Sequence, residues 1–480
     1  MMKELREGKM MKDGIVDNSK KLTKDQKRRE FITTGNVLHV VLYIAMPLMF
    51  MNAFNYLYGI IDTIVLAGKG GNVLSSVVMV DQIKSLFLAI ATSLATSGSI
   101  LVSRLIGKND FKKAKQVANT LATVAFFIAI LVIVCVIPFA RKILEFVNFS
   151  EELIDIGLGY FTVQMLSVSV SIMNNVFFGL EKARGATTNV LAINVCSMGF
   201  KIILTLFFVY VLDTGIVMVA ASTLIANLMI TTCALYKYLN KNYIFRYNFK
   251  DLLFTKEVGK PVWGLGFPIF LGKFSFSLGK VIVNVLALNF GDLAPGALGV
   301  SNSMSSSVMN VTNSMEEASS VVISQNIAIG NVARVKKTFL CSLCVNIVIS
   351  TIGITLLVIF NDNIVSYFAN GDAEMAQLIS DMFYWERISI IPLAINAAVM
   401  GLVYGLGYTK LSMYSNLARL FVFRIPSILI MMRFFSGIGA TTLGIAMFIS
   451  NTCVGLMGIT IAICLMIKMN RTVIKDEIDI

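Results

Sequence analysis

Long apolar stretches recur along this chain, separated by short polar segments. Five of them, at 117–140, 156–180, 214–235, 338–360 and 437–467, contain no Asp, Glu, Lys or Arg. A run of about 18 or more apolar residues is long enough to cross the roughly 30 Å hydrocarbon layer of a membrane. Because lipid cannot satisfy backbone polar groups, such runs must form helices or closed barrels, and barrel strands would alternate in hydropathy. The pattern therefore predicts transmembrane helices.

The same reading, extended to less apolar stretches, predicts twelve spans and an all-α polytopic membrane protein. The expected spans are 37–67, 73–103, 115–140, 156–180, 188–211, 214–236, 262–290, 297–325, 338–361, 376–405, 411–434 and 438–467. The longest break divides them into two pseudo-symmetric bundles of six helices. The expected divisions are a polar segment at 1–36, an N-lobe at 37–236, a linker at 237–261, a C-lobe at 262–467 and a tail at 468–480. The polar composition of the first segment predicts disorder.

Composition and charge agree with a membrane location. The chain is 56% hydrophobic and only 14% charged, whereas soluble domains carry about a quarter charged residues. With the N-terminus in the cytoplasm, thirty of the 41 Lys and Arg residues fall on the cytoplasmic side and four on the outside. The positive-inside rule then predicts a multi-pass plasma-membrane protein with both termini cytoplasmic. Because the basic residues are dispersed over many short loops, we expect no nucleic-acid partner.

An internal repeat supports the two-lobe organisation. A shift of 221 residues superposes Pro47 on Pro268, and each proline lies near the start of a long span. One more residue of offset superposes Gly185 on Gly407. The same shifts pair 100–103 with 321–324, Asn174 with Asn396, Gly179 with Gly401, Asn194 with Asn416 and Gly215 with Gly437. Transporters built from parallel repeats place their site between the halves, near the membrane midplane.

Several motifs, in this order, resemble the multidrug and toxic compound extrusion (MATE) family. The stretch from Pro47 to Asp62-Thr63 resembles the family's first helix, and VSRLIGKNDFKKAKQVAN at 102–119 resembles the basic loop after its second helix. GLEKARGATT at 179–188 and GLVYGLGYTK at 401–410 resemble its G-x5-G-x-T turns. The resemblance covers roughly residues 37–465. It implies two lobes in a V around a central cavity, and cation-driven export by alternating access.

The resemblance also suggests structural and coupling residues. Phe423-Arg-Ile-Pro426 resembles an eleventh-helix motif, so we expect Arg424 and Pro426 to stabilise the C-lobe. Asp62 matches the family's first-helix carboxylate. The fifth helix of the family often carries N-x3-D, which with that carboxylate forms a cation site, but the aligned residues here are Lys201 and Thr205. We therefore expect these three positions to couple transport to a cation.

A lysine in that place changes the expected chemistry. The Lys201 ammonium can reach the Asp62 carboxylate, where it would take the place of a bound sodium ion. The pair could be a static brace within the N-lobe, or a switch that forms in one conformation and breaks in the other. Some family members carry a glutamate eight residues after the helix-seven proline, and that position here is Phe276.

Further charges inside the spans mark a candidate cavity. A charge at the bilayer centre costs about 2.5–3.5 kcal/mol on insertion scales, so such residues should face the protein interior or water. The predicted substrate-cavity residues are Asp81, Lys84, Lys273, Lys280, Glu316 and Glu317. Asp81 and Lys84 lie three residues apart and could instead pair locally. A cavity of mixed charge favours a zwitterionic or partly anionic substrate.

These observations favour transport over catalysis. No GxxxxGK[ST] motif is present, which argues against a built-in ATPase, and the single histidine leaves no catalytic constellation. We expect a monomeric secondary transporter in the lipid bilayer that exports small organic molecules, either drugs or metabolites, by H⁺ or Na⁺ antiport. No metal site and no cofactor beyond the coupling ion is expected. The alternatives are a lipid-linked precursor flippase of the same superfamily and a membrane scaffold or receptor without transport.

Overall fold

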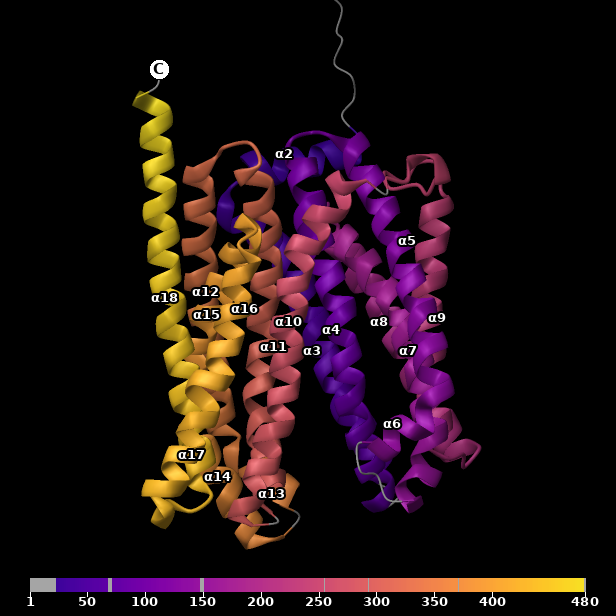
Figure 1. Ribbon diagram of the computed structural model, residues 1–480, viewed down its shortest axis with the longest axis vertical. Coiled ribbons are helices and arrows are strands. Elements are labelled where there is room, and N and C mark those ends of the chain that lie inside the picture. The colour runs from indigo at the N-terminus through magenta and orange to yellow at the C-terminus, as the bar shows by residue number, and fades with distance from the viewer. Residues whose placement is uncertain are drawn as a thin grey trace, which may run out of the picture.

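The computed structural model describes residues 23–67, 71–146, 151–253, 255–291, 293–369 and 371–478. Within these ranges the chain is helical almost throughout and contains no strand. Figure 1 shows the long helices running side by side in two groups, the N-terminal one in indigo to magenta and the C-terminal one in rose to yellow. The predicted all-α fold of two six-helix lobes is therefore confirmed.

The N-lobe helices follow the expected spans closely. They are α3 (Val37–Ala67), α4 (Gly71–Gly107), α5 (Phe111–Val136), α7 (Glu151–Ala183), α8 (Thr187–Leu206), which continues into the π-helical η2 (Phe207–Val211), and α9 (Ile216–Leu239). Two short elements, η1 (Ile137–Phe139) and α6 (Ala140–Phe146), follow α5. The apolar core of this lobe is formed by α4, α5, α6, α7 and α9, with fully buried side chains such as Phe161 and Leu144.

The C-lobe helices include two broken spans. In chain order they are η3 (Phe249–Asp251) in the linker, then α10 (Lys256–Ala287), η4 (Leu288–Phe290), α11 (Ala294–Ile327), α12 (Val332–Ile359), α13 (Asn361–Ala369), α14 (Ala373–Ile388), α15 (Ile390–Leu406), α16 (Thr409–Leu417), the π-helical η5 (Ala418–Arg424), α17 (Ile425–Phe434), η6 (Ser436–Ile438) and α18 (Thr441–Ile478). The tenth span is the pair α14–α15, bent by 46° at Ser389. Pro392 has no N–H to donate to the Ile388 carbonyl, which explains why the helix breaks there.

Nine helices in the described residues are long and apolar enough to cross a membrane, and α14–α15 makes up to ten. The eighth and eleventh expected spans do not meet this criterion, for different reasons. The 34-residue α11 is long enough but carries many Ser and Asn side chains. The eleventh span is interrupted by the π-helical η5, so neither α16 nor α17 is long enough alone.

A helix that the sequence did not predict precedes the first span. We expected residues 1–36 to be disordered, yet α2 (Lys24–Thr34) is an ordered helix that begins with a capping box between Thr23 and Gln26. Arg29 Nε donates to the carbonyls of Ile106 and Gly107 in the N-lobe, at 3.1 and 2.9 Å. Helix α2 is also bound by the C-lobe, because the Ile32 carbonyl accepts from Arg334 at 3.0 Å. Helix α2 therefore bridges the two lobes at one end of the molecule.

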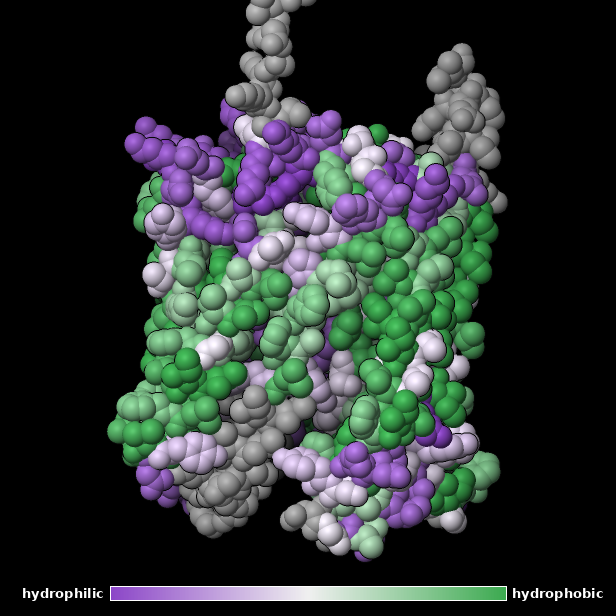
Figure 2. Space-filling view, turned by 180° about the vertical axis from the view of Figure 1, so that it is seen from behind, coloured by the Kyte–Doolittle hydropathy of each residue, from purple (hydrophilic) through white to green (hydrophobic). Residues whose placement is uncertain are grey.

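We call this end, which carries α2 and the α4–α5 and α7–α8 turns, the basic end. Figure 1 shows that α2 and the C-terminal part of α18 lie at the same end. Figure 2 shows a hydrophilic cap over this end and a broad belt of hydrophobic side chains below it. This arrangement is typical of a protein whose belt lies in the lipid.

The segment between the lobes folds onto the basic end of the N-lobe. Glu181 is fully buried there, and it accepts hydrogen bonds from Lys237 Nζ at 3.0 Å and from the Tyr243 hydroxyl at 2.7 Å. Burial and the nearby Glu181 carboxylate raise the pKa of the Tyr243 hydroxyl well above its usual range, so it stays protonated and donates. Phe245 is fully buried in the N-lobe core. The linker is thus an ordered part of the N-lobe surface.

Candidate functional site

A cavity of about 750 Å³ lies between the two lobes. The N-lobe contributes α4, through Ser85, Leu88, Ala89 and Thr92. The C-lobe contributes most of the lining, from α10, α11, α14, α15, α16, η5 and α18. Volumes of roughly 300–1,000 Å³ are typical of small-molecule sites, so the cavity can hold a drug-sized ligand.

Contacts between the lobes close the basic end, and we call this contact region the seam. Lys182 of α7 forms an ion pair with Glu317 of α11 at 2.8 Å. Gln325 Nε2 donates to the Ala183 carbonyl at 2.9 Å. Gly107 lies so close to α11 that a Cβ atom there would be 2.4 Å from the Gln325 carbonyl oxygen. In Figure 1 the two groups of helices approach each other near this end and diverge toward the opposite end.

The repeated glycine turns both lie at the basic end. Gly185 and Gly407 have φ values of +71° and +76°, in the left-handed region that glycine adopts without strain. A Cβ at Gly185 would be 2.7 Å from Ile32 of α2, and one at Gly407 would be 2.4 Å from the Arg104 guanidinium of α4. The two G-x5-G-x-T motifs therefore supply both the turn geometry and the space for these contacts.

Four of the six predicted cavity residues line the cavity, namely Lys273, Lys280, Glu316 and Glu317. The other two, Asp81 and Lys84, are not among the described residues of the lining. They form an ion pair with each other within α4, as their spacing of three residues allows. The structure thus contains the local pair at these two positions, and their role in the cavity stays a prediction.

The predicted coupling residues lie in the N-lobe, and the structure describes two of their three side chains. Lys201 is only 6% exposed, and its ammonium lies 3.9 Å from the centre of the Tyr58 ring. Thr205, one turn further along α8, shares a 2.7 Å hydrogen bond with Ser222 of α9. Asp62 falls in α3, one turn after Tyr58, but its side chain lies outside the described part of the structure.

The predicted structural residues lie at irregular points of the helices. Pro47 and Pro268 lie inside α3 and α10, where each removes one intrahelical donor. Pro426 lies in the first turn of α17, directly after the π-helical η5, where the Ile425 N–H bonds to the carbonyl of Leu420 five residues earlier. Such π-helical turns are frequent at functional sites.

Arg424 ends η5 and is only 4% exposed. It donates to Ser450 Oγ at 3.1 Å and to Asn451 Oδ1 at 2.8 Å, both on α18. The same guanidinium lines the cavity. Arg424 therefore joins η5 to α18, as expected of a lobe-stabilising residue, and also faces the site.

Sequence reasoning did not assign Glu386 and Arg419 to the cavity, although both line it. Glu386 precedes the break at Ser389 and accepts a hydrogen bond from Ser301 of α11. Sequence reasoning likewise did not identify the polar face of α11. The lining residues on that face are Asn302, Ser303, Ser305, Ser306, Asn310 and Asn313. The unusually low hydropathy of the eighth expected span was the signal that could have located this polar face of α11.

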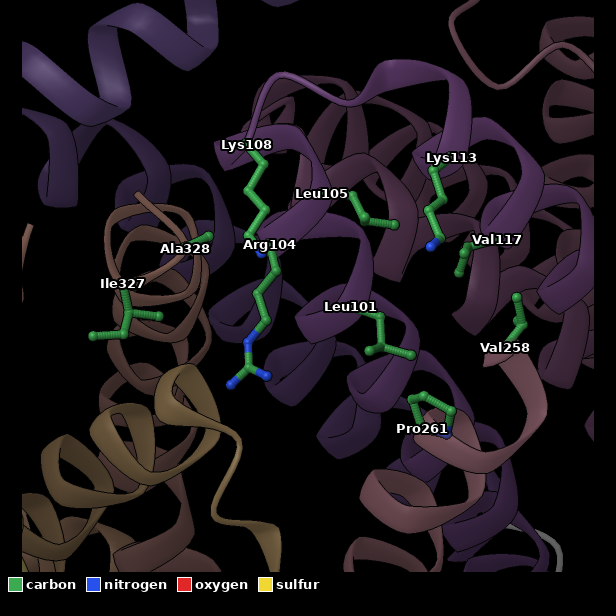
Figure 3. A pocket seen from close by; sticks show the side chains of 10 residues that line it. All are labelled: Leu101, Arg104, Leu105, Lys108, Lys113, Val117, Val258, Pro261, Ile327 and Ala328. Atoms are coloured by element: carbon green, nitrogen blue, oxygen red, sulfur yellow. The ribbon is translucent and has the colours of Figure 1, made fainter. Parts of the chain in front are cut away.

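A second, smaller pocket of about 480 Å³ lies at the basic end beside the seam. Figure 3 shows Arg104, Lys108 and Lys113 extending from α4 and α5 toward it, with Ile327 and Ala328 of the C-lobe on its other side. Because residues of both lobes border it, this pocket marks where the seam would separate if the lobes moved apart.

Known proteins resemble this chain in sequence. The multidrug export protein MepA of Staphylococcus haemolyticus (strain JCSC1435) is 21% identical over 343 residues, which is 71% of this chain and 75% of that protein. MepA of Staphylococcus aureus (strain NCTC 8325 / PS 47) is 20% identical over 266 residues, 55% of this chain and 59% of that protein.

Solved structures resemble this chain over a larger part of its length. A transporter of the MOP superfamily from Pyrococcus furiosus Vc1 (DSM3638), described as having a binding pocket of reverse polarity, superposes with a TM-score of 0.89 at 17% identity, over 94% of this chain and all of that chain. An outward-facing MATE family transporter superposes with a TM-score of 0.88 at 18% identity, over 94% and 99%. At these identities the likeness shows the fold alone.

The family itself is shown by the MatE profile, which matches the chain twice, at residues 47–207 and 268–430. The two matches begin at Pro47 and Pro268, the prolines that the internal repeat superposes, and together they cover more than half of the chain. The resemblance seen in the motifs is thereby confirmed, and the chain belongs to the MATE family of multidrug efflux transporters.

Proposed function

We propose that this protein exports small organic molecules by cation antiport, through alternating access of a central cavity. The observation that carries the proposal is the position of the cavity. Residues of both lobes line it, and contacts between the same lobes close its basic end. A substrate held there can be exposed to the other side of the membrane by opening the seam, without passing through the protein core.

The charge distribution supports an orientation for this cycle. Basic residues such as Arg29, Arg104, Lys108, Lys113 and Arg334 lie at the end that carries α2, and such residues favour the cytoplasmic side. With that end in the cytoplasm of a plasma-membrane protein, the closed seam makes this an outward-facing conformation. Loading of substrate from the cytoplasm then requires the seam contacts to break.

Coupling is assigned to Asp62, Lys201 and Thr205 in the N-lobe. The Lys201 ammonium lies against Tyr58, one helical turn before Asp62 in the same helix. In this proposal the Asp62 carboxylate either binds a proton or pairs with the Lys201 ammonium. The change from one state to the other alters the packing of α3 against α8. Burying such an ion pair costs several kcal/mol unless its geometry is good, so a change in helix packing can make or break it.

The substrate class is proposed from the relatives and the cavity. The curated relatives are named multidrug export proteins, which favours drugs or metabolites over a lipid-linked precursor. The mixed lining, with Lys273 and Glu316 in the same cavity, supports a zwitterionic or partly anionic substrate. We propose that the monomer is the working unit, because the cavity is bordered by both lobes of one chain.

The proposal is tested with purified protein in liposomes. Fluorescent cations, zwitterions and anions are loaded, and an imposed proton or sodium gradient is applied in turn. We expect one of the two gradients to drive substrate movement above the rate seen with no gradient. Equal rates with and without both gradients, for every substrate that moves, would contradict cation antiport.

A further inference from the structure

Three cationic side chains converge on the C-lobe wall of the cavity. They are Lys280 of α10 and Arg419 and Arg424 of η5, and we call them the C-lobe cation cluster. Arg419 Nη2 and Arg424 Nη2 donate to the same atom, Asn451 Oδ1, at 2.7 and 2.8 Å. Two guanidinium groups are therefore held side by side against a single amide oxygen.

The cluster is held in place by its neighbours. Asn451 Nδ2 donates to Ser389 Oγ at 2.9 Å, which turns the amide oxygen toward the two arginines. The Phe276 ring contacts two cations of the cluster, with its centre 4.9 Å from the Arg419 guanidinium carbon and 5.2 Å from Lys280 Nζ. The Asn451 amide thus contacts both arginines, and the Phe276 ring contacts Arg419 and Lys280.

The positive charge of the cluster is only partly offset within the cavity. Among the described residues, no carboxylate lies within ion-pair distance of Lys280, Arg419 or Arg424. Of the lining carboxylates, Glu317 pairs with Lys182. Glu386 accepts from Ser301 and also attracts all three cations from a longer distance, so one carboxylate faces three positive charges. Like charges held together at membrane depth are costly, and an anion placed between them would repay that cost.

The remaining lining provides space for an apolar body. Met309, Met400 and Met447 line the same cavity, and methionine side chains adapt to ligands of varied shape. The planar fork of a guanidinium matches the two oxygens of a carboxylate and binds them in parallel hydrogen bonds. An apolar molecule with one carboxylate therefore fits both parts of the lining.

We propose that the C-lobe cation cluster is a binding subsite for the carboxylate of an apolar organic anion. This inference rests on the proposed transport function and names a substrate class for it. The carboxylate lies between Arg419 and Arg424 with Lys280 completing its shell, and the apolar body extends along the methionine side chains.

Binding by the purified full chain tests the subsite without requiring transport. The probe is radiolabelled 2-naphthoate, with two competitors that carry the same ring system, neutral 2-naphthamide and cationic trimethyl(naphthylmethyl)ammonium. We expect naphthoate to bind, and both competitors to displace it poorly. We expect Arg419→Gln and Lys280→Gln each to weaken naphthoate binding about 10- to 100-fold, the size expected for a lost charge-assisted hydrogen bond. Arg419→Lys keeps the charge but loses the fork, so its loss should be smaller.

Arg387→Gln is the matched control. Arg387 lies on α14 next to the lining residue Glu386, but it packs on Tyr384 and is not among the described lining residues. Its removal should leave naphthoate affinity unchanged. All variants are compared for helix content and elution volume, and Lys280→Gln, at an exposed position, tests the subsite even if an arginine variant misfolds.

The possible outcomes separate the subsite from the transport function. Naphthoate binding no tighter than naphthamide binding, or affinity unchanged in both Arg419→Gln and Lys280→Gln, would overturn the subsite, even if liposomes show gradient-driven transport of other molecules. Naphthoate binding that depends on the cluster, in a protein that moves nothing under either gradient, would support the subsite and contradict the proposed export function.

Discussion

Asp62→Asn is expected to abolish coupled transport while leaving the folded protein intact. Asparagine is close in shape to aspartate but carries no charge, so it can neither hold the Lys201 ammonium nor exchange a proton. Lys201→Ala should also abolish coupled transport, because it removes the ammonium group of the proposed pair. In the proposed coupling site the Lys201 ammonium takes the place of a sodium ion, so transport by the unmodified protein should not depend on sodium.

Transport in liposomes and the yield of monodisperse protein are measured together. Glu145→Gln is the control, because it removes a carboxylate from an exposed pair with Arg141 on α6. It should transport normally. Normal transport by Asp62→Asn would remove this residue from the mechanism, and sodium-dependent transport by the unmodified protein would argue against the internal cation. If Asp62→Asn and Lys201→Ala both lower the yield of folded protein, the pair is a static brace within the N-lobe rather than a switch.

Gly107→Val is expected to prevent the seam from closing. The first side-chain carbon would lie 2.4 Å from the Gln325 carbonyl oxygen and 2.9 Å from its Cα atom, both backbone atoms of α11 that cannot move aside cheaply. Overpacking of this kind costs about 1–3 kcal/mol, so the conformation with the closed seam should lose roughly five- to 150-fold in relative population. Transport should fall sharply, because the cycle needs both conformations.

The control for this change is Gly199→Val on α8, where no atom lies within 4 Å of an added Cβ. Both variants are assayed for transport and for the labelling rate of a cysteine introduced at Ala328, beside the seam. Gly107→Val should be labelled faster than the control. Unchanged transport and labelling would mean that the contact at Gly107 does not hold the seam closed.

The sequence was sufficient to predict the transmembrane architecture because hydrophobic length is a local property. Each expected span corresponds to a helix or a broken helix, although α18 continues to Ile478, beyond the expected end at 467, and the 221-residue repeat located both lobes. It could not predict α2, because its partners are distant in the sequence: carbonyls at 106–107 and an arginine at position 334.

The cavity was predictable only in part. Lys273 and Glu316 were recognised because a charge deep in a span needs an interior location. The same rule also named Asp81 and Lys84, which form the local ion pair that their spacing allowed. The site role of Arg419 depends on the π-helical turn of η5 and on Asn451 of a different helix, and neither is visible in hydropathy.

Reversible closure of the seam tests alternating access most directly. Lys108 and Ala328 border the pocket in Figure 3 from opposite lobes, next to the contact between Gly107 and Gln325. Cysteines are placed at both positions, in a protein whose seven native cysteines are replaced, and are joined in liposomes by a short, reducible bismaleimide. We predict that gradient-driven export stops when the two lobes are linked and returns on reduction, while either single cysteine treated in the same way exports normally. Export at an undiminished rate through the linked protein would contradict the account.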